Sequence, residues 1–590
     1  MKIKNQYYQG NGVIPGIVIG RAFVIEREKD TDTHSHIVSQ QVEIEIDRFK
    51  NALKKGFDEL EMIKNKISAD HKDPGHILEA HQMMIQDEEL QKQVIETIRH
   101  ELVNAEWAIN KTLEKWKTLF LSVDDEYMQE RISDLKFVSR RLIRNLSGKN
   151  NYIAQPPPDA IVVAKELSPA ETIQIGKNAI SGMVIEKGGK TSHTIIIAKA
   201  FEIPTIVGIK NITTEVGTGD LLLLDANSGQ LIANPDVEMV QKYRTRMHKA
   251  LAFEQNLLKQ SAKPAKTKDD YTIKISANID FVNEIEAANS HGAEGIGLYR
   301  TEFLFINNFR DALDEKLHFK DTLKLLESSS ISPITIRTFD LGGDKFPLEA
   351  DFSNEPNPAL GLRSIRLALK ERTILKSQLR GILRAYIKNH SVELRIMFPL
   401  VGSMEEFLSA KEVYWECINE LLQEGHDIPD NISIGTMIEL PSACMISDHL
   451  ATKSDFFSIG SNDLTQYSLG IDRNNDMISD LYQPLHPGIL RLIKRTIKSA
   501  KNAKIPISVC GDTATDPIAA LILIGMGIEN LSMPPAYIPH IKKLIRNIEL
   551  RKVEKITEQA LEMQTAKGII QLFIKNFEEA IDDSRLKYSE

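Results

Sequence analysis

Cysteine is scarce in this chain, which has only three among its 590 residues: Cys417, Cys444 and Cys510. An odd and sparse count excludes a disulfide framework and is typical of proteins kept in a reducing compartment. We therefore expect a cytoplasmic protein whose thiols are free.

Long apolar runs are also absent. The most apolar stretch, residues 518–528, contains two glycines and is shorter than the ~20 residues that a membrane-spanning helix needs. The first residues, Met1 to Gln6, show no apolar core followed by a cleavage site, so we expect no signal peptide and no membrane insertion.

An excess of basic charge is missing as well. The chain has 73 Lys and Arg against 82 Asp and Glu, which gives a net charge of −9. This mild acidity argues against general binding to nucleic acid or to anionic membranes. With 42% hydrophobic and 26% charged residues, the composition is that of a globular protein, and the length suggests roughly three to five domains.

One histidine stands in an unusual setting, the turn Gly188-Gly189-Lys190-Thr191-Ser192-His193-Thr194. An apolar run follows it, so the pattern predicts a helix that opens at or near His193. A helix N-terminus, backbone N–H groups and a lysine all favour an anion there, which suits a nucleophile that accepts and passes on a phosphoryl group. For an isolated histidine, a capped helix start with a space-filling side chain is the simpler interpretation.

The first 260 residues alternate between two patterns. Residues 11–25 are strand-rich, residues 38–146 show the three-to-four periodicity of long helices, and short strands return at 160–163, 182–185, 205–207 and 221–224. This order predicts an all-helical domain inserted into an α/β domain. One charged helix is expected over 235–260, and residues 261–270, with Pro264 and three lysines, are expected to form a hinge or linker.

Eight β-like segments alternate with helical ones beyond Tyr271: 273–277, 295–298, 334–338, 394–399, 434–438, 456–459, 507–510 and 531–533. Eight strand–helix alternations over about three hundred residues predict a (β/α)₈ TIM-like barrel. A doubly wound open sheet is the alternative.

Chemically versatile residues follow the ends of these segments, where barrel enzymes carry their active sites. Arginine forks match carboxylate and phosphate oxygens, two carboxylates can hold one Mg²⁺, and a thiol with an ordinary pKa of ~8.5 is a candidate acid. Ion pairs that brace strand ends explain any one of these residues equally well. They are a much weaker explanation for six such residues that all fall at predicted strand ends. The set consists of Arg300, Arg337, Glu439, Asn462, Asp463, Arg473 and Cys510.

These motifs resemble Enzyme I of the bacterial phosphoenolpyruvate (PEP)-dependent phosphotransferase system over essentially the whole chain. The resemblance is carried by GGKTSHTIIIAKAFEIPTIVG (188–208), GIGLYRTEFLF (295–305), IRTFDLGGDK (336–345), FSIGSNDLTQYSLGIDR (457–473) and VCGD (509–512). It implies a swivelling phosphohistidine α/β domain (1–30 and 149–234), a helical domain that binds the carrier protein HPr (31–148), a linker helix (235–262) and a PEP-binding, dimerising barrel (263–590).

The resemblance also implies a role for each matched residue. His193 would be phosphorylated on Nε2 and would pass the group to HPr, releasing pyruvate in the first step of sugar uptake. Arg300, Arg337, Asn462, Asp463 and Arg473 would bind PEP. Glu439 and Asp463 would hold Mg²⁺, Cys510 would donate a proton, and the chain would form a homodimer.

The chain departs from the family pattern after the Cys-Gly pair, where Asp512-Thr513-Ala514-Thr515 replaces Glu-Met-Ala-Gly or a similar run, and a serine stands at 461 where threonine is common. Three alternatives remain open. An ATP-dependent PEP synthase or dikinase is disfavoured because the chain has no GxxxxGK[ST] run. A regulatory, nitrogen-type phosphorelay would use the same residues as sugar uptake. An inactive scaffold is disfavoured because every ligand type is present.

Overall fold

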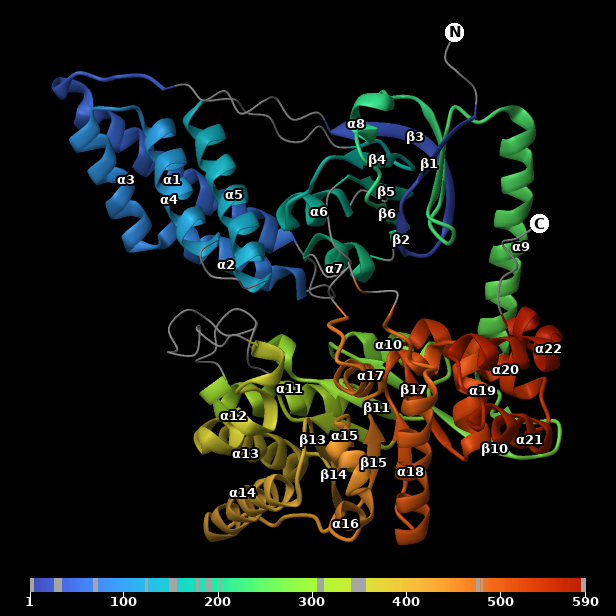
Figure 1. The fold of residues 1–590 in the computed structure, drawn as a ribbon. Coiled ribbons are helices and arrows are strands. Elements are labelled where there is room, and N and C mark those ends of the chain that lie inside the picture. Colours follow the sequence, from blue (N-terminus) through green and yellow to red (C-terminus); the bar gives the residue numbers. More distant parts are fainter. Residues whose placement is uncertain are drawn as a thin grey trace. The chain divides into compact units, whose positions relative to one another are not determined.

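The computed structural model describes the chain except for residues 1–4, 26–33, 67–72, 122–125, 148–155, 177–179, 187–192, 202, 305–311, 341–356, 474–477, 479–480 and 585–590 (Figure 1). The described residues divide into two compact units, 1–251 and 252–587. The boundary falls within one long helix, α9 (Val237–Ser261), which occupies the range expected for a charged helix.

The first unit contains an eight-stranded mixed sheet in the order β1-β8-β7-β3-β4-β5-β6-β2. Strands β3 to β6 are parallel neighbours, and the flanking pairs are antiparallel. The sequence pattern did not predict β1 and β8. The strands are β1 (Gln6–Gln9), β2 (Asn11–Ile14), β3 (Ile17–Ile25), β4 (Ile161–Ala164), β5 (Gly182–Ile185), β6 (Thr205–Val207), β7 (Leu221–Asp225) and β8 (Gln230–Ala233).

Three short helices, α6 (Pro169–Gly176), α7 (His193–Ala200) and α8 (Ile212–Glu215), connect the strands of this sheet. Ile195 and Ala198 of α7 pack on the face of the sheet formed by Val162 and Met183. The expected helix thus begins at His193, although the preceding glycine turn lies outside the described residues.

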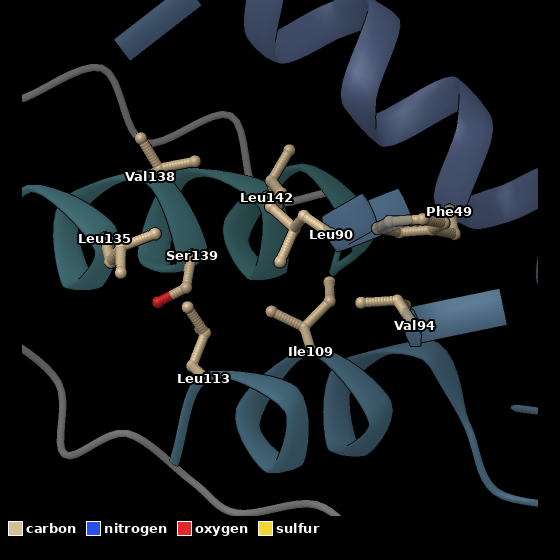
Figure 2. Close-up of a pocket in the computed structure, with 9 residues that line it drawn as sticks. All are labelled: Phe49, Leu90, Val94, Ile109, Leu113, Leu135, Val138, Ser139 and Leu142. Carbon is tan, nitrogen blue, oxygen red and sulfur yellow. The ribbon is translucent and has the colours of Figure 1, made fainter. Parts of the chain in front are cut away.

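Five helices form a bundle between β3 and β4 in the chain: α1 (Val42–Lys66), α2 (Asp73–Gln86), α3 (Glu88–Glu101), α4 (Ala105–Leu121) and α5 (Glu126–Leu146). Their apolar stripes meet in one core, which Ile173 of α6 and Ile197 of α7 extend. A small apolar pocket remains between the helices, and Ser139 is its one polar lining residue (Figure 2). The bundle contacts α6 through α1 and α2.

The second unit is a closed barrel of eight parallel strands, because β10 pairs with both β11 and β17. Closure excludes the doubly wound open sheet. The strands are β10 (Thr272–Ile279), β11 (Ile296–Arg300), β12 (Ile334–Arg337), β13 (Leu394–Phe398), β14 (Ile432–Ile438), β15 (Phe457–Ile459), β16 (Ile507–Val509) and β17 (Asn530–Met533). They are nearly continuous buried runs, as expected for strands covered on both faces.

Helices surround this barrel (Figure 1) and bury their apolar faces in one large core. Among the described residues, no helix is long and apolar enough to cross a membrane. The helices are α10 (Glu284–Ser290), α11 (Glu315–Ser328), α12 (Ser364–Lys370), α13 (Arg372–Lys388), α14 (Met404–Gln423), α15 (Pro441–Met445), α16 (Ser447–Ala451), α17 (Ser461–Leu469), α18 (Pro487–Ala503), α19 (Pro517–Met526), α20 (Ile538–Arg546), α21 (Leu550–Leu561) and α22 (Ala566–Ser584).

The expectation of a flexible linker over 261–270 was wrong. Residues Ala265–Lys266 form a short strand, β9, antiparallel to β10. The Asp269 carboxylate accepts the backbone N–H groups of Leu550 and Arg551 at 2.8 and 3.2 Å, and a hydrogen bond from Thr267 helps to lower its pKa to about 2. Lysines and a proline suggest a linker by composition, but backbone pairing and capping fasten these residues to the barrel.

Candidate active site at the barrel rim

Six of the seven predicted barrel residues lie at or just beyond the carboxyl ends of barrel strands, and the seventh, Arg473, follows helix α17. Arg300 and Arg337 end β11 and β12, and Glu439 follows β14. The first turn of α17 carries Asn462 and Asp463 directly after β15, and Cys510 follows β16. Because all eight strands are parallel, these ends lie at one edge of the barrel. The six side chains therefore share that edge, and their roles stay predictions.

Arg337 is a buried cation at this edge, with 8% of its surface exposed. Its Nη2 donates to Oε1 of Glu302 at 2.7 Å, and its Nη1 lies 3.6 Å from Oδ2 of Asp340. Burial by itself would lower the pKa of Arg337, but the charges of Glu302, Asp340, Glu439 and Asp463 outweigh it and raise the pKa. A guanidinium held by carboxylates on one side is oriented before any ligand arrives.

Arg300 has its own counterion. Its Nη1 donates to Oδ1 of Asp280, the residue after β10, at 2.9 Å. The Asp280 charge is the largest cause of the raised pKa of Arg300, while burial and the neighbouring Arg337 oppose it. The guanidinium groups of Arg300 and Arg337 can therefore lie at the same rim, because a separate carboxylate neutralises each of them.

A third arginine, Arg363, belongs to the same network. Its Nη2 donates to both carboxylate oxygens of Asp340, at 2.9 and 3.0 Å, and its Nη1 donates to the Tyr467 hydroxyl at 3.2 Å. Tyr467 lies on α17, so this chain of contacts joins the loops after β12 and β15. Neither Asp340 nor Arg363 belongs to the set of site residues predicted from the sequence.

Glu439 and Asp463 form the acidic part of the rim. Glu439 is 1% exposed, and its Oε1 accepts the Leu400 N–H at 2.6 Å. Its Oε2 and the Oδ1 of Asp463 are buried without a hydrogen-bond partner among the described residues. Burial, followed by the charges of Asp463 and Asp340, raises the pKa of Glu439 to about 8, although Arg337 opposes the shift.

Those two orphaned oxygens fit a divalent cation. Buried carboxylate oxygens without a donor are unfavourable unless a cation or a proton compensates them. Within the described part of the chain, no group of three or more His, Cys, Asp or Glu side chains gathers as a metal cage. A pair of carboxylates that leaves the other positions to ligand and water is the arrangement that Mg²⁺ favours.

Gly460 leaves the space that the Glu439 carboxylate occupies. A Cβ at Gly460 would lie 2.6 Å from Oε2 of Glu439 and 2.9 Å from its Cβ. Any other residue at this position would therefore push the Glu439 carboxylate out of its place.

Arg473 and Asn462 complete the polar rim. Arg473 is exposed, and its Nη2 lies 3.9 Å from Oδ1 of Asp463, beyond hydrogen-bond distance. Asn462 donates from Nδ2 to Oδ2 of Asp512 at 3.0 Å, and its Oδ1 accepts the Asp512 N–H at 2.9 Å.

Cys510 lies below this polar layer. It is 3% exposed and packs with Leu298, Met397, Met437 and Phe456. Burial raises the pKa of its thiol from 9.0 to about 11. The thiol therefore stays protonated at neutral pH, as a proton donor requires.

His193 begins α7 in the first unit. The next residue, Thr194, is buried and donates from Oγ1 to the Leu167 carbonyl at 2.8 Å, which fixes the start of the helix beside the N-terminus of α6.

The counterions were missed by sequence reasoning. Glu302 is the second residue after the predicted Arg300, and Asp280 is the first residue after β10. Their position at strand ends was a usable signal. Asp512 was noted only as a departure from the family pattern.

Three family models match consecutive parts of the chain. They are described as the N-terminal domain (residues 9–131), the mobile domain (156–229) and the PEP-binding domain (254–550) of PEP-utilising enzymes.

Curated relatives match over nearly the whole chain. The phosphoenolpyruvate-protein phosphotransferase of Haemophilus influenzae is 38% identical over 562 residues, which cover 95% of this chain and 97% of the relative. That of Bacillus subtilis is 36% identical, with 97% of this chain and 99% of the relative covered. That of Buchnera aphidicola subsp. Baizongia pistaciae is 37% identical, with 93% and 95% covered. The chain therefore belongs to the phosphoenolpyruvate-protein phosphotransferases, the Enzyme I family of PEP-utilising enzymes.

Proposed function

We propose that this chain transfers the phosphoryl group of PEP to its own His193 and then to a histidine of an HPr-type carrier protein, releasing pyruvate. The observation that carries the proposal is the rim itself, where oriented arginines surround two carboxylate oxygens that have no donor. Such a site suits a small ligand rich in negative charge together with a divalent cation.

Arg300, Arg337, Asn462, Asp463 and Arg473 are the proposed PEP-binding residues. Arg337 and Arg300 already lie against carboxylates, so their forks do not have to reorganise when the anion binds. Electrostatic stabilisation that is organised in advance is the main source of catalysis in phosphoryl transfer. Glu439 and Asp463 would hold Mg²⁺, which supplies positive charge beside the phosphoryl oxygens when bound.

The chemistry needs one bond exchange and one proton. The His193 Nε2 lone pair forms the N–P bond while the P–O bond of PEP breaks, and the electron pair of that bond stays on the departing enolate. The enolate carbon then takes the proton from Cys510 Sγ, and solvent restores the thiol. Because the buried thiol holds its proton firmly, Cys510 does not lose it before an enolate is present.

The domain assignment supports the second transfer. In this proposal the sheet of the first unit carries phospho-His193, the helical bundle α1–α5 docks the carrier, and α9 links both to a barrel that forms a homodimer. A phosphoramidate is labile, so the histidine can pass the group to another histidine. Three free, buried cysteines agree with a cytoplasmic protein.

Two roles share this chemistry: the first step of sugar uptake and a regulatory, nitrogen-type phosphorelay. We propose the sugar role, and the acceptor decides between them. Purified protein is incubated with labelled PEP, Mg²⁺ and candidate HPr proteins, and pyruvate and the labelled carrier are followed over time.

Two variants make this experiment specific. His193→Ala should abolish labelling of the protein, while the matched control His248→Ala, an exposed histidine on α9, should label normally. Labelling that survives in His193→Ala would falsify the assignment of the nucleophile.

A further inference from the structure

We propose that Asp512 is a positioning residue that fixes the amide orientation of Asn462, and so presents the Asn462 N–H donor to PEP. This inference rests on the proposed function and adds to it a residue outside the predicted set. Asp512 is also a position at which this chain departs from the family pattern.

The orientation of Asn462 matters because its side chain has two chemically opposite ends. One end is a carbonyl oxygen that only accepts, and the other is an NH₂ group that only donates. An anionic ligand can use only the NH₂ end. A half-turn of the amide would replace an attraction to the ligand with a repulsion.

Asp512 contacts both ends with complementary groups. The Asp512 backbone N–H donates to Asn462 Oδ1 at 2.9 Å, and the Asp512 carboxylate accepts from Asn462 Nδ2 at 3.0 Å. A half-turn of the amide would bring two donors together at one contact and two acceptors together at the other. Both contacts therefore select one orientation, in which the second Nδ2 hydrogen remains for a ligand.

The backbone around the pair is fixed as well. A Cβ at Gly511 would lie 1.9 Å from Ser461 Oγ and 3.0 Å from Asn462 Oδ1, so the two loops pack directly on each other. The Tyr482 hydroxyl donates to the Asn462 carbonyl at 3.2 Å. The loop that carries Cys510 and the turn that carries Asn462 and Asp463 are therefore packed directly against each other.

Charge alone gives no reason for a carboxylate here. Asp512 is exposed, and a negative charge beside an anion-binding amide opposes the charge of the ligand. Fixing the orientation of the Asn462 amide is a benefit that offsets this repulsion between Asp512 and the ligand. Asp512 therefore has two properties with opposite effects on PEP binding, its acceptor oxygen and its charge.

Two nearly isosteric substitutions test these properties separately. D512N keeps an acceptor oxygen without the charge, whereas D512L keeps the branched shape without an acceptor. Affinity for PEP is measured by titration calorimetry with Mg²⁺ in the full-length His193→Ala background, where bound PEP is not consumed. We expect D512N to bind PEP within about threefold of its parent and D512L to bind about tenfold more weakly, the size of one hydrogen bond to a charged ligand.

A double-mutant cycle then asks whether Asp512 acts through Asn462. In the N462A background, D512L should change PEP affinity by less than about twofold, because there is no amide left to orient. The control D516N, at the helix cap that receives the Ala519 N–H, should leave PEP affinity unchanged. Thermal unfolding of each variant shows that it is folded.

Three results would overturn the inference: D512L binding PEP like its parent, D512N binding as weakly as D512L, or D512L weakening PEP binding equally with and without Asn462. A parent His193→Ala protein that binds no PEP at all would instead refute the proposed function. The two failures are therefore distinguishable.

Discussion

Cys510 offers the most direct test of the proposed chemistry, because an acid must keep its proton until the enolate forms. Burial raises the pKa of this thiol from 9.0 to about 11, a shift of about two pKa units that favours the thiol over the thiolate by about 3 kcal/mol. At pH 7.5 the thiolate fraction then falls from ~3% to ~0.03%, a decrease of about a hundredfold.

The assay uses a protein in which Cys510 is the one remaining thiol. Replacing the buried Cys417 and Cys444 with alanine achieves this, since the chain has three cysteines. The rate of alkylation by iodoacetamide is measured from pH 7 to pH 11.5. We expect the rate to rise steeply above pH 9 without reaching a plateau before about pH 10.5.

The position of the pH midpoint is the informative quantity, because burial also slows the reagent at every pH. A midpoint below pH 9 would mean that the folded protein stabilises the thiolate. Cys510 would then suit a nucleophile, and the proton would have to come from another group.

Three further outcomes follow from individual contacts. Gly460→Ala should lower PEP-dependent phosphorylation at least about a hundredfold without preventing folding, because its methyl would displace Glu439; activity assays and circular dichroism check this. Burial lowers the pKa of His318 from 6.5 to about 4. As the pH falls below 6.5, the unfolded chain therefore binds a proton that the folded protein excludes, and the folded protein loses stability. Between pH 7 and pH 5, urea melts should show the free energy of unfolding falling by about 2 kcal/mol more for wild type than for His318→Gln. Ser139→Ala should stabilise the helical bundle by about 0.5 kcal/mol through better helix propensity, and a lower midpoint of thermal unfolding would show instead that the Ser139 hydroxyl is needed.

Local patterns predicted most of the fold because helices and strands bury their side chains with different periods. The alternation of strand and helix beyond Tyr271 was sufficient to predict the barrel, and all eight strand positions are confirmed. The errors occurred where tertiary contacts overrule composition. Residues 261–270 resemble a linker in sequence, but the capping contacts of Asp269 lie about 280 positions away in the chain.

Much of the candidate site was predictable for a topological reason. Parallel strands in a closed barrel bring all their carboxyl ends to one edge, so Arg300, Arg337, Glu439 and Cys510 had to meet once the barrel was predicted. Their chemical roles are still proposals, and so is the role of His193.

By itself, the sequence determined the family, the barrel and the residue types at its rim, because motif spacing and burial period are properties of the chain. Tertiary structure alone decided which carboxylate balances which arginine, how deeply Cys510 and Glu439 are buried, and that Asp512 faces both ends of the Asn462 amide. Those properties depend on distances between residues that are far apart in sequence, and on the loss of water around them. Both arise only when the strands close into a barrel.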